Sequence, residues 1–326
     1  MIDAEKDPIR ALFVISGNPV LSMGGEEKIR TAFQKLELLV VLDIYRNATG
    51  EMADFLLPCA DMLERSDINS CGIGMQLEPY VQFTEAVVPP RFERKEQWWI
   101  LSRIEQAMGF DSVLNEEHHD PYGRINKMLS YAELSIDKLK ALPRGTAVLP
   151  KSVPGRFFSD WIQTPDKKID CCPGIFTEAI ETAERIFQEL ENEPENQVKL
   201  ISLRNGFMHN SWYQNLEKLK KGEHRSNPVY LNSRDAGKRG LATGARVRMF
   251  NPWGAVEAIV KIDDRLRDGV AAMAHGWGNQ NTPGMKIAHQ YPGVNVNQLL
   301  PCGPGSYEKL SNQAHMTGIA VSLEKK

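Results

Sequence analysis

The feature that most constrains the fold is an uninterrupted apolar run, Leu38 to Leu42, which reads LLVVL. A strand with one face in water alternates apolar and polar residues, whereas a continuous run is typical of a parallel strand covered on both faces. A similar run, Leu12 to Ser16, precedes it and ends in the turn signal Gly17-Asn18-Pro19. Between them, Glu26 to Glu37 has the apolar spacing of an amphipathic helix. These residues predict a strand–helix–strand unit with parallel strands.

The same alternation continues for a short distance. Thr49 to Asp54 is expected to form a short helix, and Phe55 to Leu57 a third strand. We therefore expect residues 1–110 to be an α/β part with a partial doubly wound parallel sheet. Residues 111–197 are expected to be an irregular and helical connection, in which proline-rich Leu142 to Pro173 runs over the surface.

The last segment, residues 198–326, is rich in short strand patterns. The expected strands are Leu200 to Ser202, Pro228 to Leu231, Ala245 to Phe250, Ala255 to Ile262 and Gly269 to Ala274. Short strands separated by turns favour a closed barrel. The expected fold class is thus α/β followed by β.

Composition excludes several classes of protein. The formal net charge of -3 gives no basic face for nucleic acid, and no apolar run approaches the roughly 18 residues that span a bilayer, so no membrane insertion is expected. The charged N-terminus lacks an apolar signal core, which favours the cytoplasm for the chain as given. The five cysteines lack C-x-x-C spacing, which argues against a disulfide framework, a zinc ribbon or an iron–sulfur cluster.

Several segments in order carry a resemblance to one family. Ser16 to Pro19 (SGNP), Val41 to Asp43 (VLD) and Ala53 to Pro58 (ADFLLP), with Glu64 after them, resemble the third domain of the molybdopterin oxidoreductases of the dimethyl sulfoxide reductase family. The C-terminal part resembles that family's molybdopterin dinucleotide-binding domain, a six-stranded double-psi β-barrel. The matching barrel segments are Arg204 to Asn215, Asn232 to Thr243, Asn251 to Gly254, His275 to Gly278 and Asn295 to Asn297.

The resemblance implies a cofactor, molybdopterin guanine dinucleotide with molybdenum or tungsten. The expected cofactor-binding residues are Gly17, Asn18, Asp43, Arg65, Arg204, His209, Asn210, Ser211 and Asn297. Asp43, at the carboxyl end of a strand, is expected to accept hydrogen bonds from guanine, and the alternative is a helix cap or a surface carboxylate. Gly17 and Asn18 are expected to approach phosphate through backbone N–H groups, unless they form an ordinary turn.

Arg204 with His209, Asn210 and Ser211 forms a donor cluster suited to phosphate or pterin. Asn297 is expected to contact the pterin, with Asn295 as the alternative register. A cation is expected near the nucleotide at Arg65, which is otherwise a solvated surface residue.

Two segments of the family have no match in this sequence: the cysteine motif for a four-iron cluster and the segment with the molybdenum ligand. No catalytic residue and no metal ligand are therefore assigned. The expected partner is the N-terminal half of the same enzyme, which would carry the iron–sulfur cluster, and an iron–sulfur electron-transfer subunit is a further candidate. The chain alone is expected to be inactive.

Two other hypotheses make different demands on the sequence. A scaffold subunit with the same fold and no cofactor would not need the donor cluster that begins at Arg204. A nicotinamide-dependent dehydrogenase would need G-x-G-x-x-G after a predicted strand, and none is present.

Overall fold

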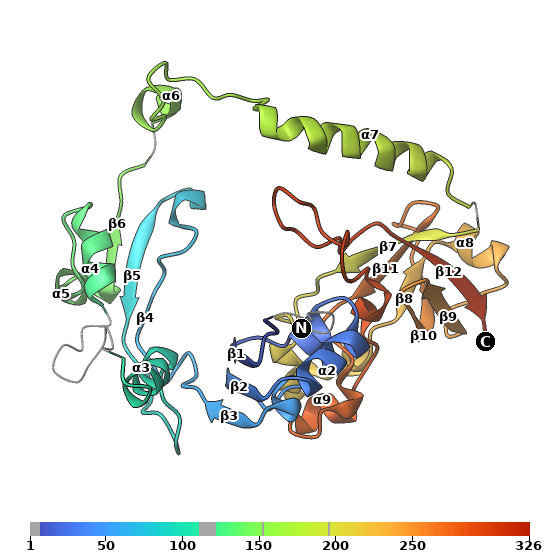
Figure 1. Cartoon of the computed structure of the whole chain (residues 1–326), viewed down its shortest axis with the longest axis horizontal. Helices are drawn as coiled ribbons and strands as arrows, with labels where there is room; N and C mark the ends of the chain where they lie inside the picture. Colours follow the sequence, from blue (N-terminus) through green and yellow to red (C-terminus); the bar gives the residue numbers. More distant parts are fainter. Residues whose placement is uncertain (1–6, 111–121, 152, 195) are drawn as a thin grey trace. The chain divides into compact units, whose positions relative to one another are not determined.

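A computed structural model of the chain describes residues 7–110, 122–151, 153–194 and 196–326 (Figure 1). The chain forms two compact units, one made of Met1–Leu56 with Gly174–Lys326 and the other of Leu57–Pro173. None of the helices in the described ranges is long and apolar enough to cross a membrane.

The two units divide the chain differently from the segments 1–110, 111–197 and 198–326. Residues 80–82 pair with a strand from residues 146–148, and residues 57–173 form a compact unit of their own. Residues 111–121 of the expected connection lie outside the described residues. The first barrel strand begins at Val198, where the predicted barrel segment begins.

The α/β part follows the apolar pattern of the sequence. Its three-stranded sheet has the order β1 (Ala11–Ile15), β2 (Leu38–Asp43) and β3 (Phe55–Pro58), and β1 is parallel to β2. The helical segments are α1 (Pro19–Ser22), α2 (Glu26–Gln34) and η1 (Gly50–Met52).

Burial explains why these residues form these elements. Val41 and Leu42 in β2 are completely buried, and Ala32 and Phe33 of α2 pack into the core of this part. Two expected helices are shorter than predicted: α2 ends at Gln34, and the segment expected as a helix from Thr49 forms a single 3₁₀ turn.

The C-terminal part is a closed six-stranded barrel, which confirms the predicted fold class. Its order is β10–β8–β11–β7–β12–β9, with β10–β8 and β11–β7 parallel and the other pairs antiparallel. The strands are β7 (Val198–Leu203), β8 (Val229–Leu231), β9 (Arg246–Asn251), β10 (Gly254–Ile262), β11 (Val270–Ala274) and β12 (Ile319–Lys325). Buried Val247, Met249 and Val260 belong to its core.

Helical segments connect the barrel strands. They are η5 (Trp212–Asn215), η6 (Glu217–Leu219), η7 (Gly222–Arg225), α8 (Ser233–Lys238), η8 (Asn279–Asn281), α9 (Lys286–Gln290) and η9 (Val296–Leu299). Before the barrel come η4 (Gly174–Phe176) and α7 (Thr177–Glu191), within the segment expected to be an irregular and helical connection.

The second unit has its own sheet and core. The sheet has the order β4 (Asp67–Ile68), β5 (Tyr80–Thr84) and β6 (Thr146–Val148). The helical segments are η2 (Ile73–Met75), α3 (Gln97–Ala107), α4 (Gly123–Ser130), α5 (Ile136–Ala141), η3 (Pro143–Gly145) and α6 (Phe157–Asp160). Strand β6 corrects the expectation of a purely surface connection from Leu142, because Ala147 is buried beside Val81 and Phe83.

The start of β10 offers a test of how tightly the barrel is packed. A Cβ on Gly254 would lie 2.4 Å from the carbonyl oxygen of Gln298, so the backbone of η9 would have to move. We predict that Gly254→Ala lowers the free energy of unfolding by about 1 to 3 kcal/mol. The control is Gly237→Ala in α8, where nothing lies within 4 Å of the added Cβ; it should be neutral or stabilise by up to about 1 kcal/mol. Equal Tm values for the two variants would contradict this packing.

Candidate functional site

Asp43 stands at the carboxyl end of β2 as its last residue. Its side chain is 3% exposed. One carboxylate oxygen accepts a hydrogen bond from the Tyr45 backbone N–H at 3.1 Å, and the other accepts from the Asn47 amide at 2.9 Å. Burial raises the pKa of this carboxyl, partly offset by the hydrogen bonds it accepts. The carboxylate is therefore fixed in position and costly to leave charged.

The turn after β1 lies beside this carboxylate. The Asn47 amide also donates to the Gly17 carbonyl at 3.3 Å. The Asn18 side-chain oxygen accepts from the Thr49 backbone N–H at 3.2 Å and from its hydroxyl at 3.0 Å. Three residues predicted for the site, Gly17, Asn18 and Asp43, are thus brought together. Sequence reasoning missed Asn47 and Thr49, although polar residues directly after a buried strand are a signal for this edge of a sheet.

The donor cluster follows β7 on the barrel side and is exposed, apart from half-buried Ser211. The Arg204 guanidinium donates to the side-chain oxygen of Asn210 at 3.3 Å, and the His209 ring lies 5.7 Å from the Trp212 ring. Burial lowers the pKa of nearby His275, and the charge of Arg204 lowers it further. Arg204 and His275 therefore share one electrostatic environment at the end of β7 and β11.

Two glycines let the loop after β11 approach the other site segments. A Cβ on Gly276 would lie 2.2 Å from the Asn210 carbonyl oxygen, and one on Gly278 would lie 2.5 Å from the Asn295 Cβ. Both glycines have positive φ, a backbone conformation that side chains disfavour. The segment from His275 to Gly278 thus contacts both the donor cluster, at Asn210, and the segment around Asn295.

Asn295 and Asn297 connect the barrel to the α/β part. Asn297 donates through its amide to the Leu21 carbonyl at 2.7 Å, and Asn295 donates to the Glu26 carboxylate at 2.9 Å. Gln298 donates to the same Glu26 oxygen at 2.9 Å. The amide nitrogen of Asn297 thus has a structural partner within the chain, and its expected contact with the pterin stays a prediction.

Several buried polar atoms have no hydrogen-bond partner within the described part of the chain. They are the Asn18 amide nitrogen, Trp277 Nε1, both side-chain polar atoms of Asn279 and the Thr282 hydroxyl. Buried polar groups are nearly always hydrogen-bonded, so unpaired ones call for an explanation. Four of the five atoms lie in residues 277–282, which begin between Gly276 and Gly278 and continue past them.

This barrel segment lies against the loop that follows Asp43. The Gly284 N–H donates to the Glu51 carboxylate at 2.7 Å, and a Cβ on Gly284 would lie 2.7 Å from the Arg46 Cβ. Gly284, two residues after Thr282, is therefore the point at which this segment contacts the loop after β2. Sequence reasoning gave no sign of Asn279 and Thr282.

Arg65 belongs to the other compact unit, Leu57–Pro173. Its guanidinium forms an ion pair with Asp67 at 3.0 Å, and both side chains are substantially exposed. Its assignment to the nucleotide stays a prediction. Among the described residues, no group of three or more His, Cys, Asp or Glu side chains is placed to hold a metal ion, and the five cysteines are free thiols.

Comparison with known proteins identifies the class. Residues 198–311 match the family described as molydopterin dinucleotide binding domain, and residues 1–107 match the family described as molybdopterin oxidoreductase. The chain is 28% identical to a putative dimethyl sulfoxide reductase chain, YnfE, of Escherichia coli over 98% of this chain and 43% of that protein. It is 25% identical to the dimethyl sulfoxide reductase DmsA of the same species over 82% of this chain and 37% of that protein.

A solved structure shows the same fold. Acetylene hydratase from Pelobacter acetylenicus superimposes on 97% of this chain and 44% of its own, with a TM-score of 0.70 and 18% sequence identity. The chain belongs to the molybdopterin oxidoreductases of the dimethyl sulfoxide reductase family. It corresponds to their C-terminal part, the end of the oxidoreductase domain with the molybdopterin dinucleotide-binding domain. It spans less than half the length of these relatives.

The joint between barrel and sheet can be tested at Glu26, which is 4% exposed and also pairs with Arg30 at 2.8 Å. We predict that Glu26→Ala lowers the free energy of unfolding by about 2 to 4 kcal/mol, because two buried amides lose their acceptor and Arg30 loses its partner. Hydrogen exchange should become faster in residues 295–298. Exposed Glu27→Ala is the matched control and should stay within about 0.5 kcal/mol of the parent. Identical exchange in both variants would show that Glu26 does not hold the joint.

Proposed function

We propose that this chain holds the guanine end and the pterin of a molybdopterin guanine dinucleotide, as the C-terminal part of a molybdenum or tungsten oxidoreductase. The observation that carries the proposal is the buried carboxylate of Asp43 at the carboxyl end of β2, with the unpaired amide nitrogen of Asn18 in the adjoining turn. That edge of a parallel sheet is where α/β proteins bind nucleotides. An unpaired buried donor in this turn fits a polar ligand that would accept from it.

Guanine recognition suits the chemistry of Asp43. A carboxylate has about four lone-pair positions, and donors to the Asp43 carboxylate are Tyr45, Asn47 and the backbone N–H of Ile44. Capacity for a further hydrogen bond thus remains, and guanine offers two adjacent donors on N1 and N2. Such bonds would also offset the burial that raises the pKa of Asp43.

The remaining predicted residues would bind other parts of the ligand, some from the sheet and some from the barrel. Gly17 and Asn18 would bring backbone N–H groups and an unpaired amide to phosphate. Arg204, with His209, Asn210 and Ser211, presents exposed donors for phosphate or pterin. The roles proposed for Arg65 and Asn297 are a cation near the nucleotide and a pterin acceptor, respectively.

The bound group would supply oxygen-atom or electron transfer at its metal, while the protein supplies orientation and electrostatics. No residue of this chain is assigned a catalytic role, and we propose that the chain is inactive alone. The relatives are more than twice as long, which supports the N-terminal part of the same enzyme as partner. Phe13 and Ile15 on edge strand β1 are 39% and 43% exposed, which suits packing of that partner. The iron–sulfur cluster and contacts with an electron-transfer subunit would belong to that part of the enzyme.

Asp43→Asn tests guanine recognition. The substitution leaves one acceptor oxygen and places an NH2 group against a guanine donor, so we predict a loss of about 1 to 3 kcal/mol in binding. The measurement is the guanine nucleotide released by acid from the complete enzyme, with the N-terminal part present, for parent and variant.

Glu27→Gln removes a carboxylate charge at an exposed position and serves as the matched control. Arg204→Ala should also reduce retention, and its effect should shrink at high salt if its partner is phosphate. Parent-like retention by both Asp43→Asn and Arg204→Ala would refute the site and favour a scaffold without cofactor.

A further inference from the structure

A cavity of about 220 Å³ lies at the mouth of the barrel, beside the donor cluster. Its walls come from the segment after β7, from η7, from the start of β8 and from the end of β11. The residues that line it are Asn205, Phe207, Met208, Lys220, Glu223, His224, Ser226, Asn227, Pro228, Tyr230, Ala274 and Trp277. This volume is large enough for several water molecules or a small oxyanion.

Lys220 is the unusual residue of this cavity. Its side chain is 3% exposed, and within the described ranges it has no carboxylate partner. Its ammonium donates to the side-chain oxygen of Gln214 at 2.6 Å and to the Met208 Sδ at 3.6 Å, and it lies 4.7 Å from the centre of the Trp277 ring. A buried ammonium normally has a counter-ion, because an amide oxygen, a thioether and a ring face carry no full negative charge. Burial accordingly lowers the pKa of Lys220 to about 8.

The surrounding residues hold Lys220 in place. Gln214 is itself completely buried and donates to the Tyr291 carbonyl at 3.0 Å. The Arg225 guanidinium donates to the Lys220 carbonyl at 3.1 Å. The ammonium therefore does not owe its position to an ion pair, and it has little freedom to leave the cavity for solvent.

Trp277 covers one side of the ammonium. It is 2% exposed and lines the same cavity, and the face of its ring lies against Lys220. The ring carries no charge that balances the ammonium, so an anion in the cavity would supply the missing counter-ion.

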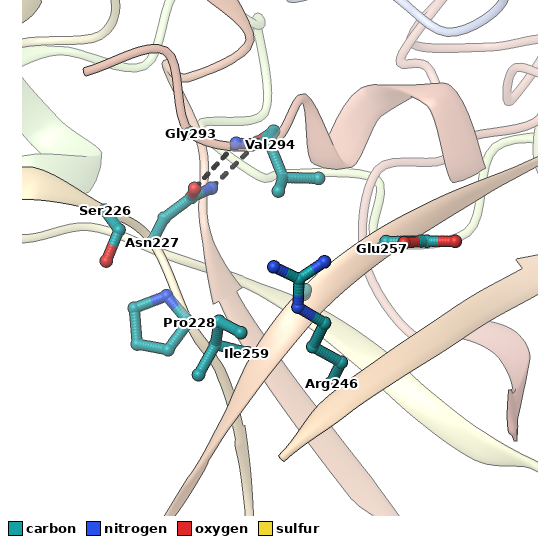
Figure 2. Close-up of a pocket in the computed structure, with 9 residues that line it drawn as sticks. Ser226, Asn227, Pro228, Arg246, Glu257, Ile259, Gly293 and Val294 are labelled. Atoms are coloured by element: carbon teal, nitrogen blue, oxygen red, sulfur yellow. Dashed lines mark hydrogen bonds between the residues drawn. The ribbon is translucent and has the colours of Figure 1, made fainter. Parts of the chain in front are cut away.

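Asn227 forms the wall between this cavity and a neighbouring one. Its amide exchanges two hydrogen bonds of 2.8 Å with the backbone of Val294, drawn as dashed lines in Figure 2. It also donates to the Ala274 carbonyl at 2.9 Å. Figure 2 shows the neighbouring cavity, of about 130 Å³, with Arg246 and Glu257 extending from barrel strands. Since the Asn227 side chain is fully engaged, the wall is rigid and the Lys220 cavity keeps its shape.

Besides Lys220 and the Tyr230 phenol, the titratable groups that line the cavity are Glu223 and His224. Glu223 forms an ion pair with Lys261 at 2.6 Å, so its charge is largely compensated. The His224 ring packs on Phe207, with the ring centres 3.5 Å apart. Neither group supplies Lys220 with a counter-ion, and the cavity keeps a positive character.

We propose that this cavity is an anion site for a phosphate group, held by the Lys220 ammonium. A phosphate group carries negative charge and several acceptor oxygens, so it can pair with the ammonium and accept a hydrogen bond from it. A cation is excluded by Lys220, and a neutral ligand would leave the ammonium uncompensated. The proposal does not require that Asp43 binds guanine, so the two can fail separately.

The phosphate could be borne by a nucleotide or be free in solution, and the experiment separates these sources. Inorganic phosphate, pyrophosphate and GDP are titrated into the 326-residue chain by calorimetry. We expect Lys220→Met to weaken binding about tenfold or more, as expected for losing a charged hydrogen bond. Exposed Lys221→Met is the matched control and should change affinity less than about twofold. Lys220→Arg should restore part of the affinity.

The pH dependence gives a second readout that needs no variant. Lys220 is charged below its pKa of about 8, so anion binding by the parent chain should weaken as the pH rises through that value. Tighter binding of GDP than of inorganic phosphate, with the same dependence on Lys220, would identify a nucleotide as the source, and equal affinities would identify free phosphate. Absence of binding by the parent, or equal binding by parent and Lys220→Met, would overturn the proposal.

Discussion

One buried carboxylate, that of Glu26, determines how the first unit of this chain is built. It accepts hydrogen bonds from Asn295 and Gln298 of the barrel and pairs with Arg30 on its own helix. A buried charge is tolerated only where it is paired and hydrogen-bonded, so these partners fix the geometry within narrow limits. The bond from Asn297 to the Leu21 carbonyl acts at the same joint. Sheet and barrel therefore form one compact unit although they have separate apolar cores.

The joint has a direct consequence for ligand binding. In the proposed site the sheet would contribute an acceptor, Asp43, and the barrel would contribute donors, among them Arg204. A dinucleotide carries donors on its base and negative charge on its phosphates, so a protein that holds both ends needs these opposite chemistries at a fixed separation. Glycines at 276 and 278 allow the barrel loop to approach closely enough for its polar residues to take part. The unpaired atoms of Asn279 and Thr282 are consistent with a region that is completed by a ligand.

The sequence was informative where local pattern decides structure. The apolar runs located β1, β2 and five barrel strands within a few residues, and the position of Asp43 at a strand end followed directly. Strand β12 was missed, because its exposed polar residues hide the alternation and its partners β7 and β9 are distant in sequence. The second unit was missed for a similar reason, since β6 pairs with β5 across more than sixty residues. The burial of Lys220 could not be predicted, because it depends on residues from several strands and loops meeting at one place.

The central claim is that this chain recognises the guanine of a dinucleotide, and the nucleotide released from the complete enzyme tests it most directly. The enzyme, purified with its N-terminal part, is treated with acid, and the released nucleotide is identified by mass spectrometry and quantified against the protein. We predict that GMP is released, in a molar amount close to that of the enzyme or to a small multiple of it. Release of CMP, or of no nucleotide from enzyme that contains folded chain, would contradict it.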